Sequence, residues 1–504
     1  MPGGGQLHDG LDPDRVAAVG DAALGAAARL GASHATVRVE RIRSQAVALR
    51  DGRVETTADD TELGVGLRVV HRGAPGFAAT VAIGTDAAAA LATSAVEVAR
   101  LTSLAGRRPL ELADEPSHGT LRWSSPYRRD PTEVPLADKV ALLEGWSHRL
   151  LGAPGIAHVT AQVLAVGEDK YLADLSGTVA VQRRVRIHPV VGAMAVADDG
   201  DFEEMRTLAP PAGRGWEYVE GDGWDWDGEL AEMADLLAAK LAAPSVEPGP
   251  YDLVVDPTNL WLTIHESVGH ATELDRAMGY EAAYAGTSFA TPDQLGSLRY
   301  GSPLMHVTGD RTTEHGLATV AVDDEGVAAQ SFDLVADGVL VGYQLDRAMA
   351  AAAGLGRSNG CSFADSPLHV PIQRMANVSL QPAGGDGPTT DDLVGGVERG
   401  IYVAGDKSWS IDMQRRNFQF TGQRFFAIRH GRLAGQLRDV AYQASTTDFW
   451  GSLEAVGGRG TYRLGGAFNC GKGQPGQVAP VSHGCPSVLV RQVRVLNTLR
   501  ESGR

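Results

Sequence analysis

Cysteine, net positive charge and long apolar runs are all scarce in this sequence of 504 residues. Its three cysteines, Cys361, Cys470 and Cys485, are too few for a disulfide framework. The first ten residues, MPGGGQLHDG, lack the charged and then apolar pattern of a secretory signal. We therefore expect the cytoplasm to be the compartment of this protein.

The shortage of positive charge and of apolar runs excludes two classes of partner. The formal net charge is −17, whereas broad binding to nucleic acid or to anionic lipid needs a basic surface. The longest apolar stretches, such as AAAALA at 87–92, fall far short of the roughly 20 residues that cross a bilayer. We expect no nucleic-acid partner and no membrane span.

The composition that remains is that of a globular protein with more than one core. Hydrophobic residues make up 43% of the chain and charged residues 21%, and the length allows two or more domains. A composition shift at the linker SVEPGPY predicts a boundary near residue 246, with an N-terminal domain over 1–246 and a β-rich domain over 247–504. Asp51-Gly52 is typical of a hairpin turn. Helical spacing of apolar residues predicts helices over 12–31, 85–103, 135–151 and 228–244.

The stretch WLTIHESVGHATELD, residues 261–275, carries the most specific chemical signal. His265 and Glu266 begin like the zinc-protease motif H-E-x-x-H, but the second histidine, His270, comes one residue late. Two neutral imidazoles and one further side chain leave the fourth position of a tetrahedral zinc site open for water. Zinc lowers the pKa of such a water to about 7, and the carboxylate of Glu266 could accept the proton.

The spacing of the two histidines predicts a distorted helix. Five steps of a regular helix, at about 100° each, place His270 about 140° away from His265 around the helix axis. A one-residue π-bulge, or a break at Gly269, would bring both imidazoles toward one metal. The alternative is that the two histidines are structural, with Glu266 as a capping partner.

A cysteine far downstream is a candidate for the third ligand. Cys470 lies in the glycine-rich segment GGAFNCGKGQPGQ at 465–477, and Lys472 nearby could help to hold its thiolate. His483 and Cys485, in VSHGCPS, are rival sources of a third donor.

With these segments in view, the chain resembles the TldD/PmbA metallopeptidase family, and specifically its catalytic TldD branch. The segment VAVDDEGVAAQSFDLVADGVLVGYQLDR at 320–347 looks like the family's D-D-E-G region and the strand pair that follows it. The likeness spans nearly the whole chain and is strongest over 251–480. The family's diagnostic motifs, H-E-x-x-x-H and a late C-G-K, correspond to His265, Glu266 and His270 and to Cys470, Gly471 and Lys472.

The resemblance implies a particular site, fold and set of partners. It implies one zinc ion per chain, held by His265, His270 and Cys470, with Glu266 as general base. It implies an α+β fold in which an α/β N-terminal domain precedes a β-rich, barrel-like C-terminal domain that carries the distorted metal-binding helix. It also implies a peptide or unfolded polypeptide as substrate, and as partner a PmbA/TldE-like paralogue that lacks the metal motif, or a second copy of this chain.

The function expected from this reading is that of a zinc metallopeptidase acting on unstructured polypeptides. Two uses of such a peptidase fit the sequence equally: removal of leader peptides from modified peptide natural products, and degradation of small regulatory proteins. The competing hypothesis is a binding or assembly subunit in which the metal only stabilises structure, for which four protein ligands would be usual. The sequence does not indicate which residues bind the substrate.

Three further patterns favour structural explanations. GRSNG at 356–360 matches G-x-S-x-G, but no helix is expected after it. GAFNCGK at 466–472 matches a phosphate loop, except that glycine follows where serine or threonine is needed. The acidic run Asp323, Asp324 and Glu325 predicts a solvated turn between strands rather than a cation site.

Overall fold

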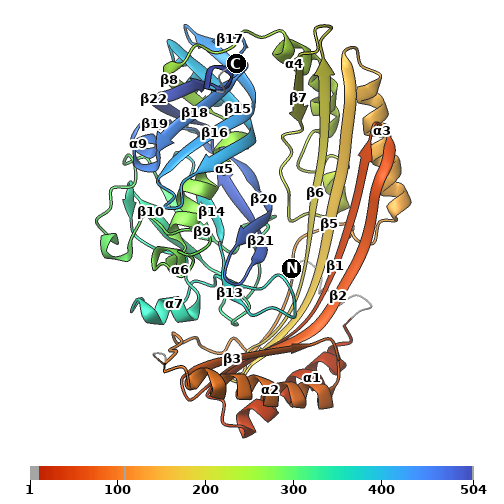
Figure 1. Ribbon diagram of the computed structural model, residues 1–504, viewed down its shortest axis with the longest axis vertical. Coiled ribbons are helices and arrows are strands. Elements are labelled where there is room, and N and C mark those ends of the chain that lie inside the picture. The colour runs from red at the N-terminus through yellow and green to blue at the C-terminus, as the bar shows by residue number, and fades with distance from the viewer. Residues whose placement is uncertain (1–10, 107–108, 502–504) are drawn as a thin grey trace.

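The computed structural model describes residues 11–106 and 109–501 and shows two parts that lie side by side (Figure 1). The N-terminal half forms a long curved sheet, and the C-terminal half forms a barrel with smaller sheets beneath it. None of the helices in these described ranges has the length and apolar character that a membrane span requires.

The N-terminal half contains the following elements: α1 (Pro13–Arg29), β1 (His34–Arg50), β2 (Arg53–His71), β3 (Ala74–Thr80), α2 (Thr85–Ser103), β4 (Thr120–Ser124), α3 (Leu136–Leu151), β5 (Ile156–Asp174), β6 (Val179–Val196), β7 (Phe202–Arg206), η1 (Trp216–Tyr218) and α4 (Trp226–Leu241). The four helices expected in this half are confirmed, with ends within three residues of the predicted ones. The carboxylate of Asp12 begins α1 by accepting a hydrogen bond from the amide of Asp14 at 3.0 Å.

Four long antiparallel strands form the centre of the N-terminal sheet. The strand order is β3-β2-β1-β5-β6-β4, and β7 pairs with β6. The predicted hairpin is confirmed, since Asp51 and Gly52 join β1 to β2 with positive φ angles of 50° and 72°. Helices α1 and α2 lie at one end of the sheet, while α3 and α4 pack on its strands near the other end (Figure 1).

The C-terminal half contains the following elements: β8 (Gly249–Val255), α5 (Pro257–Ile264), η2 (His265–Gly269), η3 (His270–Thr272), α6 (Leu274–Ala277), η4 (Pro292–Gln294), β9 (Val307–Asp310), β10 (Ser331–Ala336), β11 (Val339–Leu340), α7 (Arg347–Ala352), β12 (Ser362–Phe363), β13 (Ile372–Gln373), β14 (Asn377–Leu380), α8 (Thr390–Gly395), β15 (Arg399–Ile411), β16 (Asn417–Arg429), β17 (Arg432–Gln436), β18 (Val440–Ser445), α9 (Thr446–Gly451), β19 (Leu453–Val456), η5 (Arg459–Thr461), β20 (Arg463–Lys472), β21 (Gln477–Cys485), β22 (Val488–Asn497) and α10 (Thr498–Glu501).

The predicted barrel is confirmed in the C-terminal half. Strands β15, β8, β22, β18 and β16 pair in that order, and a further pairing of β15 with β16 closes the ring. Strands β20 and β21 form a separate hairpin. The fold class is therefore the expected α+β arrangement, while the boundary near residue 246 stays a prediction.

Helix α5 carries the chain from the barrel to the histidine-bearing segment. Asp256 caps its first turn by accepting from the amide of Thr258 at 3.0 Å, and Pro257 occupies the first position, where no amide is needed. Leu260, Leu262 and Ile264 are buried, because α5 packs between β15 and the β20–β21 hairpin. This packing fixes the direction in which the following residues leave the helix.

The acidic turn at residues 323–325 is not solvated, so that prediction is wrong. Its three carboxylates are at most 3% exposed. Asp324 accepts hydrogen bonds from Lys170 at 2.6 Å and from Arg38 at 3.1 Å, and Glu325 pairs with Arg68. Because these cations belong to β5, β1 and β2, the turn holds the long sheet against the C-terminal half.

Candidate metal centre

The segment after α5 is a π-helix, which confirms the predicted distortion. Residues His265–Gly269 form the π turn, and the amide of His270 donates to the carbonyl of His265, five residues back. The wider turn places the imidazole rings of His265 and His270 with their centroids 4.7 Å apart. Regular helical geometry would have separated the two rings.

Two side chains donate hydrogen bonds to carbonyls of the π turn, one from a distant segment and one from the turn that follows it. Gln344 donates to the carbonyl of Gly269 at 2.7 Å, and Thr272 donates to that of Val268 at 2.8 Å. A side chain at Gly269 would also come within 2.6 Å of the sulfur of Met375. The distortion is therefore built from satisfied hydrogen bonds and close packing.

The fold brings the three residues predicted as ligands into one group. One donor atom each from His265, His270 and Cys470 lies within 4.8 Å of the others, and all three residues are buried. Cys470 reaches the group from β20, where the pairing with β21 shifts register between Ala467 and Cys470. Their role as ligands stays a prediction.

Hydrogen bonds around the two imidazoles fix which nitrogen of each ring faces the group. Nδ1 of His483 donates to the carbonyl of Val378 at 2.9 Å, so its Nε2 accepts from Nδ1 of His265 at 2.7 Å. Nδ1 of His270 donates to the carboxylate of Glu273 at 2.8 Å. Both candidate ligands thus keep an Nε2 lone pair, as histidines that bind metals do.

The electrostatics of the group suit a soft divalent cation. Burial lowers the pKa of both His265 and His270 and so favours neutral imidazoles. Burial acts to raise the pKa of the Cys470 thiol, but the imidazole of His270 and the guanidinium of Arg374 outweigh it and lower the pKa below its ordinary value. Two neutral imidazoles and a thiol that ionises readily are donors that fit zinc.

The cation beside Cys470 is not the one expected from the sequence. Lys472 points instead to three carboxylates, those of Glu273 at 3.0 Å, Asp275 at 2.8 Å and Glu281 at 3.3 Å. Arg374 donates to the carbonyl of Cys470 at 2.6 Å. Lys472 therefore acts on the group through Glu273, whose pKa it holds well below the ordinary value against the opposing effect of burial.

Glu266 lies next to His265 and is held by a guanidinium. Its Oε2 accepts from Arg415 at 2.6 Å, and Arg415 belongs to the turn at residues 412–416 between β15 and β16. This contact orients the carboxylate proposed as the general base.

The rival third donors take other positions. His483 lies behind His265 as seen from the candidate ligand group, and it accepts a hydrogen bond from the Nδ1 of His265. Cys485 is buried with its sulfur 3.6 Å from the carbonyl oxygen of Pro257, and Cys361 is a buried free thiol. The side chains of His369 and His430 are at least half exposed.

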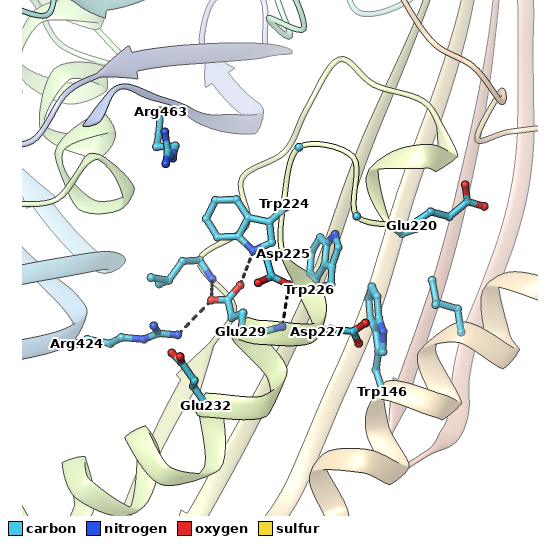
Figure 2. Close-up of a pocket in the computed structure, with 16 residues that line it drawn as sticks. Trp146, Glu220, Trp224, Asp225, Trp226, Asp227, Glu229, Glu232, Arg424 and Arg463 are labelled. Atoms are coloured by element: carbon cyan, nitrogen blue, oxygen red, sulfur yellow. Dashed lines mark hydrogen bonds and ion pairs between the residues drawn. The ribbon is translucent and has the colours of Figure 1, made fainter. Parts of the chain in front are cut away.

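A large cleft lies elsewhere in the molecule. It has a volume of about 990 Å³ and is lined by residues of α3, of α4 and the segment before it, and by Arg424 of β16 and Arg463 of β20. Figure 2 shows Trp224 and Arg424 converging there on the carboxylate of Glu229. None of the three candidate ligands lines this cleft. Cavity size alone would therefore point away from the chemically distinctive group.

Replacing His483 with alanine is expected to weaken zinc binding about 10- to 100-fold, since partners one layer behind a metal ligand have effects of that size. Glutamine at this position should restore much of the affinity, because its carbonyl can accept from His265. Competition with a chromophoric chelator measures the dissociation constants. His430→Ala, at an exposed histidine, is the matched control. Equal zinc affinities in the wild type, the two His483 variants and the control would contradict the role of His483 in orienting His265.

Two family models describe the class to which this fold and site belong. The model of domain 1 of the PmbA/TldA metallopeptidases matches residues 35–99, and that of their C-terminal domain matches residues 248–497. Together they cover more than half of the chain. The protein is thus of the metallopeptidase class, and it belongs to the PmbA/TldD family.

Individual relatives match along almost the whole chain. A metalloprotease from Methanothermobacter thermautotrophicus is 27% identical over 92% of this chain and 96% of its own length. A protein named zinc metalloprotease TldD homolog from Saccharolobus solfataricus is 23% identical over 93% of this chain and 98% of its own length. The crystal structure of TldE from Thermococcus kodakarensis has the same fold, with a TM-score of 0.67 at 14% identity over 94% of this chain and 98% of that one.

Proposed function

We propose that this protein is a zinc-dependent peptidase that hydrolyses peptide bonds in unfolded or unstructured polypeptides. The observation that carries the proposal is the buried group of His265, His270 and Cys470 with the carboxylate of Glu266 beside it. Three protein donors with a neighbouring carboxylate are typical of a catalytic zinc site, whereas structural sites use four donors.

The residues of the chain divide the work of hydrolysis among them. One zinc ion per chain would be held by Nε2 of His265, Nε2 of His270 and the thiolate of Cys470. When bound, the metal supplies a Lewis acid that acidifies water and polarises a carbonyl. Glu266 accepts a proton from the water that attacks the carbonyl carbon, and it delivers that proton to the amine nitrogen as the C–N bond breaks. Arg415 holds the carboxylate in place for both transfers.

The substrate and the partner are further parts of the proposal. Leader-peptide removal from modified peptide natural products and degradation of small regulatory proteins are the two uses that it includes. Since a solved structure named TldE shares the fold, a PmbA/TldE-like paralogue without the metal motif is the proposed partner, with a homodimer as the other arrangement. The three free cysteines suit a reducing compartment such as the cytoplasm.

Removing the metal is expected to abolish cleavage of a reduced and alkylated protein, and one equivalent of zinc should restore it. The physical reason is that the carboxylate of Glu266 alone does not polarise the scissile carbonyl. Mass spectrometry of the products, with the chain alone and with its paralogue, measures the loss and the recovery. A chain that binds zinc but cleaves nothing in either setting would favour the metal-stabilised assembly subunit instead.

A further inference from the structure

Large apolar side chains are exposed on two segments beside the proposed metal centre. The first segment, residues 278–286, follows α6 and carries Tyr280 and Tyr284, which are 60% and 69% exposed. The second segment is the turn at 412–416, where Met413 is 55% exposed. Exposed apolar groups that gather near a functional site are typical of a binding surface.

The first segment is attached to the hairpin that carries Cys470. The carboxylate of Glu281 pairs with Lys472 at 3.3 Å and accepts from the amide of Gly473 at 3.4 Å. The ring of Tyr284 lies directly on Gly473, where an added Cβ would be only 2.0 Å from it. Tyr284 therefore packs three residues beyond Cys470 with most of its surface open.

The second segment is attached to the proposed general base. Arg415, two residues after Met413, forms the 2.6 Å ion pair with Glu266. The carbonyl of Met413 accepts from the amide of Thr287 at 2.8 Å. Gly286, at a φ of 92°, lies so close that a Cβ there would be 2.0 Å from the same carbonyl. The two segments thus meet backbone to backbone.

These contacts attach exposed apolar side chains to two elements of the proposed site. Tyr284 is anchored through the hairpin of Cys470, and Met413 is anchored through the turn that holds Glu266. An extended polypeptide advances about 3.3 Å per residue, so a side chain one or two positions from the cleaved bond lies within about 7 Å of it along the chain. A large apolar side chain at such a position is the natural partner for the exposed side chains of Tyr284 and Met413.

We propose that Tyr284 and Met413 are specificity-determining residues that bind a large apolar side chain of the polypeptide substrate, within about two positions of the cleaved bond. This inference rests on the proposed function and names a substrate class for it, namely unstructured segments that contain leucine, methionine or an aromatic residue. The amide of Tyr284 and the carbonyl of Met413 are hydrogen-bonded within the fold, to the carbonyl of Glu281 and the amide of Thr287, while the side chains of Tyr284 and Met413 are mostly exposed.

Cleavage mapping on a library of denatured peptides tests the inference. Zinc-loaded full-length wild type is expected to favour sites with a large apolar residue within two positions of the cut. Tyr284→Ser and Met413→Ser should each lower kcat/KM about tenfold or more for a peptide with leucine there, and much less for the same peptide with serine. Leu104→Ser, at a residue 81% exposed beyond the end of α2, is the matched control.

The outcomes separate this inference from the proposed function. Unchanged preference in both variants, at unchanged zinc content, would overturn it. The inference would also be overturned if light scattering showed that the variants change oligomeric state while their cleavage-site preference is unchanged, because the surface would then belong to a contact with a partner chain. If the wild-type protein cleaves nothing, the proposed function fails. Binding of the labelled leucine and serine peptides to zinc-loaded protein, measured by fluorescence anisotropy, then tests the inference separately. Tighter binding of the leucine peptide that depends on Tyr284 would support the inference, and equal binding of the two peptides would overturn it.

Discussion

Replacing Cys470 with alanine is expected to raise the dissociation constant for zinc about 100-fold or more. Four-ligand zinc sites are worth about 10–16 kcal/mol, so one donor accounts for about 3 kcal/mol, and each 1.4 kcal/mol is a factor of about ten. The purified variant should then lose the metal during dialysis against a chelator. Elemental mass spectrometry gives the metal content, and chelator competition gives the affinity.

Two matched variants make this result specific. His270→Ala should lose the metal as Cys470→Ala does, because both donors belong to the same group. Cys485→Ala should keep about one zinc per chain, since the sulfur of Cys485 lies beside the carbonyl of Pro257 instead. Zinc that persists in Cys470→Ala and disappears in Cys485→Ala would overturn the proposed ligand set.

Replacing Glu266 with glutamine is expected to lower kcat for peptide cleavage about 10²- to 10⁴-fold while zinc binding persists. Glutamine is nearly the same size and can still accept a hydrogen bond from Arg415, but its amide cannot take up the proton released by the attacking water. Steady-state rates on a peptide cleaved by wild type, together with metal content, measure the effect.

The comparison needs a glutamate that is chemically equivalent but remote. Glu314→Gln meets this need, since its side chain is 76% exposed and belongs to a surface loop. Wild-type turnover in Glu266→Gln, at equal zinc content, would show that another group accepts the proton. Loss of zinc in that variant would instead indicate that Glu266 shapes the metal site.

The local structure of the chain could be predicted closely from the sequence. Asp12 and Asp256 are helix caps, and Asp51-Gly52 is a hairpin turn, because these short polar residues and glycine satisfy nearby backbone groups on their own. The spacing of His265 and His270 predicted either a π-bulge or a break at Gly269, since a regular helix cannot place two residues five apart on one face, and the structure contains the π turn.

The surroundings of the site could be predicted less well. Lys472 was expected beside Cys470, yet it binds Glu273 and its neighbours, while Arg374 donates to the backbone carbonyl of Cys470. Glu273 carried a readable signal, since it follows His270 by three residues in a helical stretch. The contacts of Arg374 and Arg415 carried none, because each spans about a hundred residues or more of sequence.

The sequence by itself determined which donors this protein possesses, the family to which it belongs and the helix distortion that joins two of the donors. Only the tertiary structure decided that Cys470 joins those two histidines, that His483 stands one layer behind them, and that the acidic turn at 323–325 is buried. The physical reason is that capping, turn and helix geometry depend on residues a few positions apart. Proximity between β20, β21 and the π turn depends instead on how distant strands pair and pack.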